Sequence, residues 1–293
     1  MTVPPFTFSF SFMPMTPAIN IDTQRCAQCG RCVQVCPSSV FSGTKDSAIQ
    51  VLRPEYCIQC GHCVDICSTN ALIHGSFPAE KVHYINYSLL PTPSSLMELI
   101  RSRRSNRTFT DTSIPKEAIQ DILEAARYAP TAENSRKVKI SVLHAEQIQL
   151  VEDATMNFFL RLSRILMNPI IRPITRLCLP NLYHEAPELS RFETRWKAGE
   201  RPCTCNAVTI LVFSAPKGYD FGWQDCNLAY QNASLMAQAH GISQVYMGLV
   251  QSAFKYMSSS RVSCLLHLPK KHQQYAIMAL GFPALKYGKY TER

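Results

Sequence analysis

Apolar residues recur at helical spacing in two neighbouring stretches of the chain. Residues 95–105 would form a helix whose apolar face consists of Leu96, Leu99 and Ile100. Ser94 or Ser95 stands where the N-cap of this helix is expected. A second helix is expected to open at Pro115, with an apolar face made of Ile119, Ile122, Leu123 and Ala126. Both helices lie well inside the chain, after a region of different composition.

Three further stretches have the pattern of strands. Residues 138–143 alternate between apolar and polar, residues 208–215 are almost continuously apolar, and residues 276–282 are apolar again. Between the last two, residues 225–240 predict a helix with a small apolar face, closed by Gly241 as a C-cap. Regular structure is therefore expected throughout the second half of the chain.

The first part of the chain divides differently. Residues 1–20 are aromatic and proline-rich and contain no Lys or Arg, so they resemble neither a secretory signal nor a transit peptide. We interpret them as a loose arm or an edge strand. Residues 76–94 contain the Pro- and Ser-rich stretch NYSLLPTPSS, which indicates a linker. A length of 293 residues suits two domains, which we place at residues 21–75 and 95–293.

The strongest motif is an internal repeat of cysteines in the first of these domains. Two runs with the spacing C-x2-C-x2-C-x3-C are offset by 31 residues, and their intervening residues also match: CAQCGRCVQVC and CIQCGHCVDIC. The eight cysteines are Cys26, Cys29, Cys32, Cys36, Cys57, Cys60, Cys63 and Cys67. Three thiolates at this spacing wrap one iron–sulfur cube, and the fourth lies too far along to reach the same cube.

The repeat resembles a bacterial-type two-cluster ferredoxin, in which each fourth cysteine binds the other cluster. The resemblance implies two 4Fe–4S clusters. One would be held by Cys26, Cys29, Cys32 and Cys67, and the other by Cys57, Cys60, Cys63 and Cys36. Pro37 follows the first run as in that family, whereas Ser68 replaces the second proline. A zinc site would leave the third cysteine of each run unused, and a disulfide framework would be expected with a secretory signal.

Composition excludes several classes of protein. No apolar run reaches the ~18 residues of a membrane span, and thirteen cysteines without an export signal indicate a reducing cytosol and hence a cytoplasmic protein. The formal charge of +9 overstates the true charge, because thiolate-bound clusters are anionic. The remaining positive charge suits phosphate or an acidic electron donor. No nucleic-acid-binding motif is present.

Positive charge gathers after the first predicted helix. Within seven residues the chain carries Arg101, Arg103, Arg104, Ser105 and Arg107. Arginine forks bind phosphate in a bidentate manner, and a serine hydroxyl adds a further donor. The alternative is a solvated basic face, which most such clusters form.

This run and three later motifs resemble the FMN-dependent nitroreductase family over residues 95–293. That family has an R-R-S-x-R run, here residues 103–107, and a helix ending in A-P-S-A-x-N-x-Q-P, here residues 129–137. It also has a D-x3-A-x-Q-N-x3-A helix, here starting at Asp225, followed by a glycine-containing turn that includes Gly248. The chain as a whole resembles a ferredoxin–nitroreductase fusion.

The resemblance implies an α+β fold: a small ferredoxin-like two-cluster domain, then an α-β-α domain with a central mixed sheet. It implies FMN bound at a homodimer interface. Arg103, Arg104, Ser105 and Arg107 would hold the flavin phosphate and the pyrimidine edge of the ring. Asn134 would hydrogen-bond the isoalloxazine, and Gly248 would present a backbone N–H near it. The remaining flavin-binding candidates are Pro130, Thr131, Arg136 and Lys289, of which Arg136 replaces the Gln of the family and Lys289 its usual terminal Arg.

The functional hypothesis follows from this pairing. Electrons would enter through the clusters from reduced ferredoxin or a similar donor and leave from FMN to a nitroaromatic, quinone or related acceptor. No catalytic side chain is named, because the flavin carries the chemistry. The alternatives are an NAD(P)H-dependent flavin or quinone reductase and a non-catalytic electron carrier or redox sensor. No G-x-G-x-x-G nucleotide fingerprint is present.

Several other residues receive less weight. Residues 158–182 mix arginines with bulky apolar side chains and three prolines, so we expect a lid or dimer contact rather than a membrane-surface helix. His62 is expected to shape the surroundings of a cluster. Trp223 and Tyr246 are expected in the core. The remaining cysteines are expected to be buried apolar residues: Cys178, Cys203, Cys205, Cys226 and Cys264.

Overall fold

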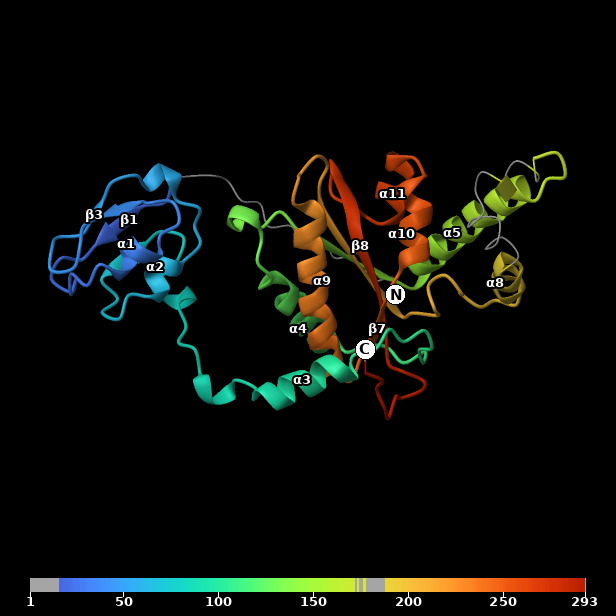
Figure 1. Cartoon of the computed structure of the whole chain (residues 1–293), viewed down its shortest axis with the longest axis horizontal. Helices are drawn as coiled ribbons and strands as arrows, with labels where there is room; N and C mark the ends of the chain where they lie inside the picture. The colour runs from blue at the N-terminus through green and yellow to red at the C-terminus, as the bar shows by residue number, and fades with distance from the viewer. Residues whose placement is uncertain (1–15, 172, 174–175, 178–187, 293) are drawn as a thin grey trace. The chain divides into compact units, whose positions relative to one another are not determined.

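The structure is a computed structural model that describes residues 16–171, 173, 176–177 and 188–292. The chain divides into two compact units (Figure 1). Among the described residues, the N-terminal unit consists of those up to Pro91 together with Ala132–Ser135. The C-terminal unit consists of Thr92–Thr131 and the chain from Arg136 onward.

The N-terminal unit is built from two small antiparallel sheets and short helices. One sheet pairs β1 with β4, and the other pairs β2 with β3. In chain order its elements are β1 (Ile19–Ile21), α1 (Arg31–Val35), β2 (Phe41–Ser42), β3 (Gln50–Val51), η1 (Pro54–Tyr56), α2 (His62–Asp65), β4 (Leu72–His74), η2 (Ala79–Lys81) and η3 (Tyr87–Leu89). β1 therefore begins at Ile19, inside the expected N-terminal arm.

The sequence repeat is also a repeat of backbone conformation. Gly30 and Gly61 precede α1 and α2 with φ of 70° and 83°, a left-handed conformation that glycine adopts at little cost. Other residues 31 positions apart also share a positive φ: Gln28 with Gln59, and Ser39 with Asn70. The two cysteine runs therefore fold as two copies of one local structure.

The hydrophobic core of the N-terminal unit is small, and cysteine side chains pack against it. Its buried residues include Val40, Phe41, Ile49 and Leu72, together with Cys63. Several other cysteines of the runs pack against this core while partly exposed: Cys26, Cys32, Cys36, Cys57 and Cys67. A unit of this size buries too little apolar surface to be stable easily on its own, and bound metal centres commonly supply the difference.

The C-terminal unit contains a four-stranded sheet and longer helices. In chain order its elements are α3 (Pro93–Ser102), α4 (Lys116–Arg127), β5 (Lys139–His144), α5 (Ala145–Leu166), α8 (Glu188–Lys197), β6 (Thr209–Pro216), α9 (Gly222–Ala239), β7 (Ser243–Tyr246), α10 (Gly248–Lys255), α11 (Ser259–Leu265) and β8 (His272–Gly281). The short turn η4 (Ala132–Asn134) between α4 and β5 groups with the N-terminal unit.

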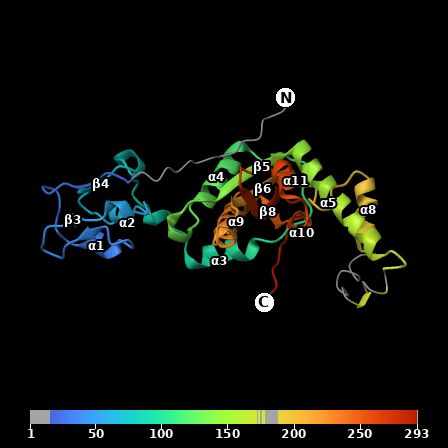
Figure 2. The same cartoon turned by 90° about the horizontal axis from the view of Figure 1, so that it is seen from above.

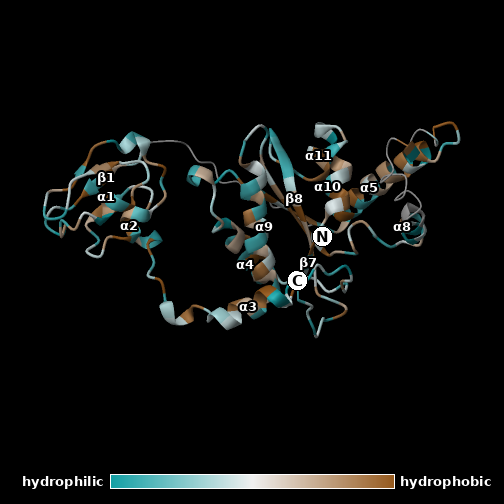
Figure 3. Ribbon diagram, in the orientation of Figure 1, coloured by the Kyte–Doolittle hydropathy of each residue, from teal (hydrophilic) through white to brown (hydrophobic). Residues whose placement is uncertain are grey.

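The sheet has the strand order β5-β6-β8-β7, and these neighbours are antiparallel. The described strands of this sheet are thus all antiparallel, and the parallel pairing of Ser105 with Gln244 of β7 is an isolated bridge outside them. β6 is buried along nearly its whole length, which explains its continuous apolar sequence. β8 begins with the polar residues His272–Gln274, where Figure 3 shows it in teal, and becomes apolar where it enters the core.

Helices cover both faces of this sheet (Figure 2). Leu211 and Phe213 of β6 point to the core shared with α4 and α9, whereas Ile210 and Val212 point to the core shared with α5, α10 and α11. This alternation is what a two-residue side-chain period requires of a central strand. The α-β-α layering expected from the resemblance is confirmed.

The first helix of this unit begins before its expected cap. The N-cap of α3 is Thr92, whose hydroxyl accepts a hydrogen bond from the Ser95 N–H at 3.2 Å; neither Ser94 nor Ser95 holds that position. Pro93 explains the shift, because proline is favoured at the first helical position. The apolar face of α3 is not buried, since Leu96 and Ile100 are each 42% exposed.

Three residues expected in the core are exposed. Trp223 is 61% exposed in the first turn of α9, and Tyr246 is 36% exposed at the end of β7. Cys264 is exposed because it lies two residues beyond the buried Val262 of α11, on the opposite side of the helix. Cys203 and Cys226 are buried and Cys205 is half-buried, as expected.

The segment 158–182 does not form one element. α5 continues to Leu166, and Asn168-Pro169 follows its end. Part of the segment, including Cys178, lies outside the described residues, so a role as lid or dimer contact stays a prediction. Among the described helices, none has the length and apolar composition required to cross a membrane.

Candidate functional site

Four cysteines from both runs line one pocket in the N-terminal unit. The pocket is lined by Cys36 of the first run and by Cys57, Cys60 and Cys63 of the second. These four are the ligands that the ferredoxin resemblance assigned to one cluster. His62, which is exposed, and the buried His74 also line the pocket.

The thiols of this pocket are close enough to affect one another. Burial, together with charge on Cys57, Cys60 and Cys36, raises the pKa of Cys63 to about 12. The pKa of Cys57 is also raised, first by burial and then by charge on Cys60 and Cys36. Such a group of thiols resists deprotonation unless a cation compensates the charge, and thiolate binding to a metal centre supplies that compensation.

The thiols predicted to hold the other cluster differ from one another in their pKa shifts. Burial raises the pKa of Cys32, with a further contribution from charge on Cys26 and Cys29. For Cys67, burial raises the pKa, but hydrogen bonds from Leu72, Thr69 and Ala71 outweigh it and lower the pKa below its usual value. Stabilisation of the thiolate form suits a metal ligand. The assignment of Cys67 to the cluster of the first run stays a prediction.

Backbone amides reach the fourth cysteine of each run. The Val40 N–H donates to Cys36 Sγ and the Ala71 N–H donates to Cys67 Sγ, each at 3.3 Å. These two bonds are again 31 residues apart. Amide donors to sulfur are a regular means of stabilising anionic iron–sulfur centres.

The donor set fits iron–sulfur cubes better than single ions. Among the described residues, no three or more His, Cys, Asp and Glu side chains form a group that could hold one metal ion. A 4Fe–4S cube, by contrast, places each thiolate on a different iron and needs a cavity between the sulfurs. The pocket between Cys36, Cys57, Cys60 and Cys63 provides such a cavity.

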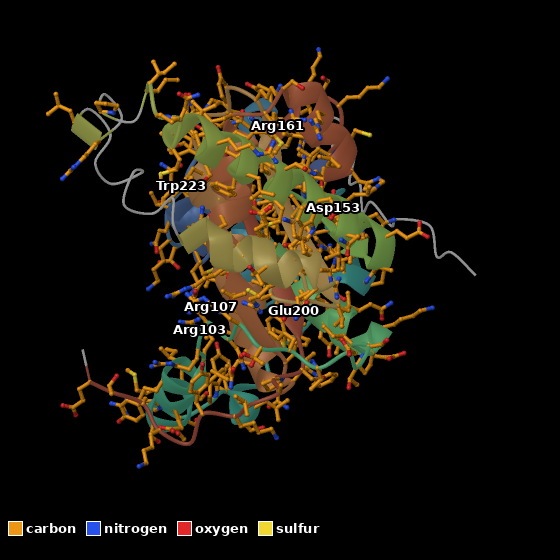
Figure 4. The ribbon with its side chains drawn as sticks, turned by 90° about the vertical axis from the view of Figure 1, so that its right-hand side faces the viewer. Arg103, Arg107, Asp153, Arg161, Glu200 and Trp223 are labelled. Atoms are coloured by element: carbon orange, nitrogen blue, oxygen red, sulfur yellow. The ribbon has the colours of Figure 1, made fainter. Side chains whose placement is uncertain are left out.

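In the C-terminal unit, the arginine run follows directly on α3. Arg103 is the C-cap of α3 and, like Arg104, is half-buried, whereas Ser105 and Arg107 are exposed (Figure 4 labels Arg103 and Arg107). Burial raises the pKa of Tyr230, and positive charge on Arg103 offsets part of that rise. Burial likewise raises the pKa of Cys205, with a partial offset from charge on Arg107. None of the three arginines forms an ion pair within the described part of the chain. Their charges are thus available to an anion.

Asn106 fixes the arginine run in place. It is 2% exposed, its Oδ1 accepts from the Thr108 N–H at 2.9 Å, and its Nδ2 donates to the Leu285 carbonyl at 3.3 Å. Its backbone N–H donates to the Gln244 carbonyl at 3.0 Å. One buried side chain thereby ties the run to the C-terminal tail, while its backbone joins β7.

The C-terminal tail lies along the arginine run. The Arg104 guanidinium lies 5.7 Å from the centre of the Tyr287 ring, and that of Arg101 lies 5.1 Å from the Tyr290 ring. Lys289, which is exposed, stands between these tyrosines in the sequence. The fold therefore brings the tail that carries Lys289 to the predicted anion site, although the two are about 180 residues apart in sequence.

Gly248 opens α10 immediately after β7. It is exposed, and a Cβ added to it would meet no atom within 4 Å. The first N–H groups of a helix have no partner within the helix, so this N–H is available to a ligand. Since Gln244 of the same strand bonds to the backbone of Asn106, β7 connects Gly248 to the arginine run.

The remaining flavin candidates surround η4. The Thr131 hydroxyl accepts from the Arg136 N–H at 3.1 Å, and Pro130 and Arg136 are exposed. Asn134 belongs to the N-terminal unit, where its Nδ2 donates to the Ile58 carbonyl at 3.0 Å and to the Gln59 carbonyl at 2.8 Å. The role of Asn134 as a flavin contact stays a prediction.

One residue of the cysteine pocket, His74, belongs to no sequence motif. His74 is 2% exposed, and its Nε2 lies 3.4 Å from Cys57 Sγ. In the 31-residue repeat, His74 corresponds to Gly43 of the first half. This difference between the two halves is the sequence signal that distinguishes His74. Burial lowers the pKa of His74, which favours the neutral ring.

Comparison with protein families supports both units. The model of the nitroreductase family matches residues 100–282, which is more than half of the chain. The chain belongs to the nitroreductase family. The model of a 4Fe-4S dicluster domain matches residues 18–68. This member of the nitroreductase family therefore carries a dicluster domain ahead of its nitroreductase domain.

Individual relatives in the nitroreductase family are distant. The chloronitrobenzene nitroreductase of Comamonas testosteroni is 34% identical over 70 residues, which is 24% of this chain and 31% of that relative. The chain thus matches about a third of the length of this relative.

Two solved structures show the same fold. A nitroreductase with bound FMN from Bacteroides fragilis has a TM-score of 0.51 at 20% identity, covering 67% of this chain and 94% of that one. A nitroreductase with bound FMN from Desulfitobacterium hafniense has a TM-score of 0.51 at 20% identity, covering 67% of this chain and 93% of that one.

Proposed function

We propose that the chain is an iron–sulfur flavoprotein oxidoreductase. It passes electrons through two 4Fe–4S clusters to FMN and on to a nitroaromatic, quinone or similar acceptor. The observation that carries the proposal is the pocket lined by Cys36 together with Cys57, Cys60 and Cys63. A fourth thiolate supplied by the other run is the arrangement of a two-cluster ferredoxin.

The two cysteine runs would each hold one cluster. Cys57, Cys60, Cys63 and Cys36 would ligate the cluster in the pocket, and Cys26, Cys29, Cys32 and Cys67 would ligate the other. The N–H groups of Val40 and Ala71 would stabilise the thiolates of Cys36 and Cys67 through the bonds described above. The small apolar core on which the cysteines pack would limit access of water to the clusters.

The arginine run would bind the phosphate and the pyrimidine edge of FMN. Arg103, Arg104 and Arg107 have no carboxylate partner among the described residues, and Ser105 is exposed beside them. Lys289 would add a cation from the tail, and the Gly248 N–H would face the ring. Pro130, Thr131 and Arg136 would lie at the same site by resemblance to the family.

When bound, the clusters would supply single electrons and the flavin would supply electron transfer to the acceptor. The chain's own residues would bind and orient these groups, and protons would come from water. The solved FMN-containing nitroreductases share this fold, and the name of the Comamonas relative indicates activity on a nitroaromatic compound. Both observations support the proposed cofactor and acceptor class.

A homodimer would complete the flavin site, as the family resemblance implies. The apolar face of α3 supports this, because Leu96, Met97 and Ile100 are 42%, 45% and 42% exposed. A second copy of the chain would cover such a face. Light scattering coupled to gel filtration would give twice the chain mass of 33.0 kDa if the proposal holds, and the single mass would contradict it.

The decisive experiment is a cofactor analysis followed by a turnover assay. Anaerobically purified protein should contain about eight iron and about eight acid-labile sulfide per chain, together with one FMN. Rapid mixing with reduced ferredoxin should then reduce the flavin, and a nitroaromatic or quinone should reoxidise it over many cycles. Flavin reduction by NAD(P)H but not by ferredoxin would favour the alternative donor. Cluster reduction without repeated turnover would favour an electron carrier.

A further inference from the structure

We propose that His74 donates a hydrogen bond from Nε2 to the thiolate of Cys57 and thereby raises the reduction potential of the cluster in that pocket above that of the other cluster. This inference rests on the proposed function, because it requires two clusters to be bound. It concerns a residue outside the cysteine motif and the flavin site. It makes the two halves of the repeat chemically different.

The hydrogen bonds of the imidazole decide which nitrogen carries the proton. The Ser76 N–H donates to His74 Nδ1 at 3.1 Å, so Nδ1 must be an acceptor and carries no hydrogen. A neutral ring with a bare Nδ1 has its proton on Nε2. Nε2 lies 3.4 Å from Cys57 Sγ, within the range of a hydrogen bond to sulfur. The N–H therefore points at the thiolate that would bind iron.

The imidazole is held firmly in this position. His74 lies in β4, where it pairs with Ile19 of β1, and its carbonyl accepts from the Phe77 N–H at 2.9 Å. Its ring packs on that of Phe77 with 4.9 Å between the ring centres. The ring is 2% exposed, so water does not compete for its N–H.

A short network extends from the imidazole to the Cys57–Cys60 loop. The Ser76 hydroxyl donates to Gln59 Oε1 at 2.9 Å, and the Gln59 N–H donates to Cys57 Sγ at 3.4 Å. The Gln59 carbonyl accepts from Asn134 Nδ2 at 2.8 Å. Cys57 Sγ thus has two donors aimed at it, one from a side chain and one from the backbone.

The first half of the repeat has no equivalent of this side chain. The residue 31 positions before His74 is Gly43, and the residue that corresponds to Cys57 is Cys26. Gly43 has φ of 125°, and a Cβ there would lie 2.8 Å from Ile49 Cδ1 and 2.9 Å from the Ala48 carbonyl oxygen. A histidine cannot occupy that position. Among the described residues, Cys26 Sγ accepts no hydrogen bond.

This asymmetry has a defined electrochemical direction. Each cluster gains one negative charge when it accepts one electron, and part of that charge resides on the thiolate sulfurs. A donor N–H stabilises the more negative state more strongly, so it raises the reduction potential. We expect the cluster next to His74 to be reduced first and the other cluster second.

The test is a redox titration of the holoenzyme followed by electron paramagnetic resonance. In His74→Phe the ring and its packing on Phe77 are retained but the donor is lost. We expect the higher of the two potentials to fall, with on the order of a tenfold loss in the reduced-to-oxidised ratio at a fixed potential, or about 59 mV for one electron. The lower potential should not change. His74→Gln, which keeps an N–H donor, should restore most of the shift.

Two control variants sharpen the titration. His62 lines the same pocket but is exposed, so His62→Gln should leave both potentials in place. The Thr69 hydroxyl lies 3.8 Å from Cys67 Sγ, a predicted ligand of the other cluster, so Thr69→Val can shift only the lower potential. Unchanged potentials in His74→Phe, or an equal shift of both, would overturn the inference.

A second measurement covers the case in which His74→Phe does not assemble. Histidine labelled with nitrogen-15 in the His62→Gln background should give a nuclear coupling to the unpaired spin of the first-reduced cluster. A lack of this coupling would overturn the inference. Iron analysis separates the two proposals: fewer than about eight iron per wild-type chain contradicts the two-cluster function itself, whereas a full complement with no coupling contradicts only the role of His74.

Discussion

The two units of this chain assemble their candidate sites in different ways. In the N-terminal unit the cysteines of both runs lie within 42 residues, and the small fold of this unit brings Cys36 into a pocket with Cys57, Cys60 and Cys63. In the C-terminal unit the candidate residues come from the run after α3, the start of α10 and the C-terminal tail. Only the paired strands of the folded sheet bring them together. The first site is therefore encoded locally, and the second depends on tertiary structure.

The largest expected effect comes from removing one thiolate. Cys60→Ala should reduce the iron content from about eight to about four per chain, because the cluster in the pocket would lose one of its four ligands. Flavin content should not change, since the flavin site draws on other residues. Iron, sulfide and flavin analysis of anaerobically purified protein measures all three.

The matched control for this variant is Cys264→Ala, which removes an exposed cysteine outside both runs. It should retain the full iron content. Loss of FMN together with iron in Cys60→Ala would show that the flavin site depends on the cluster site. It would contradict the view that the two units form their sites separately.

Removing one cation of the flavin site should have the next largest effect. Arg104→Ala should weaken FMN binding by about tenfold to a hundredfold, because a charge-assisted hydrogen bond contributes about 1.5–3 kcal/mol. The clusters should stay intact. Flavin released on gel filtration, and the dissociation constant from fluorescence quenching of added FMN, measure the change.

Arg101→Ala provides the control, because Arg101 belongs to the same basic cluster and also packs on a tail tyrosine, but lies in the last turn of α3, outside the R-R-S-x-R motif of residues 103–107. It should bind FMN nearly as the wild type does. Stoichiometric FMN retained by Arg104→Ala would contradict the phosphate-site assignment.

Loss of Asn106 should affect stability before it affects binding. Asn106→Ala would leave the Leu285 carbonyl and the Thr108 N–H without their partner, at a cost of about 1–3 kcal/mol. Both tryptophans, Trp196 and Trp223, belong to the C-terminal unit, so urea unfolding followed by tryptophan fluorescence reports on that unit. Asn227→Ala, which removes an exposed bond to the Trp223 carbonyl, should cost under about 0.5 kcal/mol. Equal costs in the two variants would refute the role assigned to Asn106.

The smallest expected effect is on stability in Gly248→Ala. Since an added Cβ meets open space, the free energy of unfolding of the flavin-free protein should change by less than about 0.5 kcal/mol. FMN affinity should nevertheless fall if the ring lies against this position, because the Cβ would occupy its space. Gly222→Ala should behave in the opposite manner: its Cβ would lie 2.7 Å from the Tyr275 ring, so stability should fall. Unchanged FMN affinity in Gly248→Ala would remove Gly248 from the flavin site.

Much of this architecture was predictable from sequence periodicity. The strands β5, β6 and β8 and the helices α4 and α9 lie within a few residues of their expected positions. The spacing of apolar residues in long runs distinguishes a helix from a strand, so these elements can be predicted from the sequence. The cap at Thr92 was missed because Ser94 and Ser95 are equally good cap residues, and the choice depended on Pro93. The exposure of Trp223 and Tyr246 was missed because composition does not reveal which side of a helix or strand end faces solvent.

The candidate sites were predictable to different degrees. The resemblance of the cysteine runs to a two-cluster ferredoxin predicted the grouping of Cys36 with the second run. The position of Asn106 beneath the arginine run, and the bonds of Asn134 to the Ile58 and Gln59 carbonyls, depend on contacts between distant segments and have no sequence signature. The role of His74 could be predicted only in part. A comparison of the two halves of the cysteine repeat is what distinguishes it from an ordinary buried histidine.

The matching left-handed residues of the two cysteine runs bear on ancestry. A gene segment that is duplicated in tandem first yields two halves of identical backbone, and the backbone constrains later change more tightly than surface side chains do. Gly30 and Gly61, with Ser39 and Asn70, retain that common backbone, whereas Gly43 and His74 differ. A tandem duplication would account for halves that match in backbone and differ in a side chain such as that of His74.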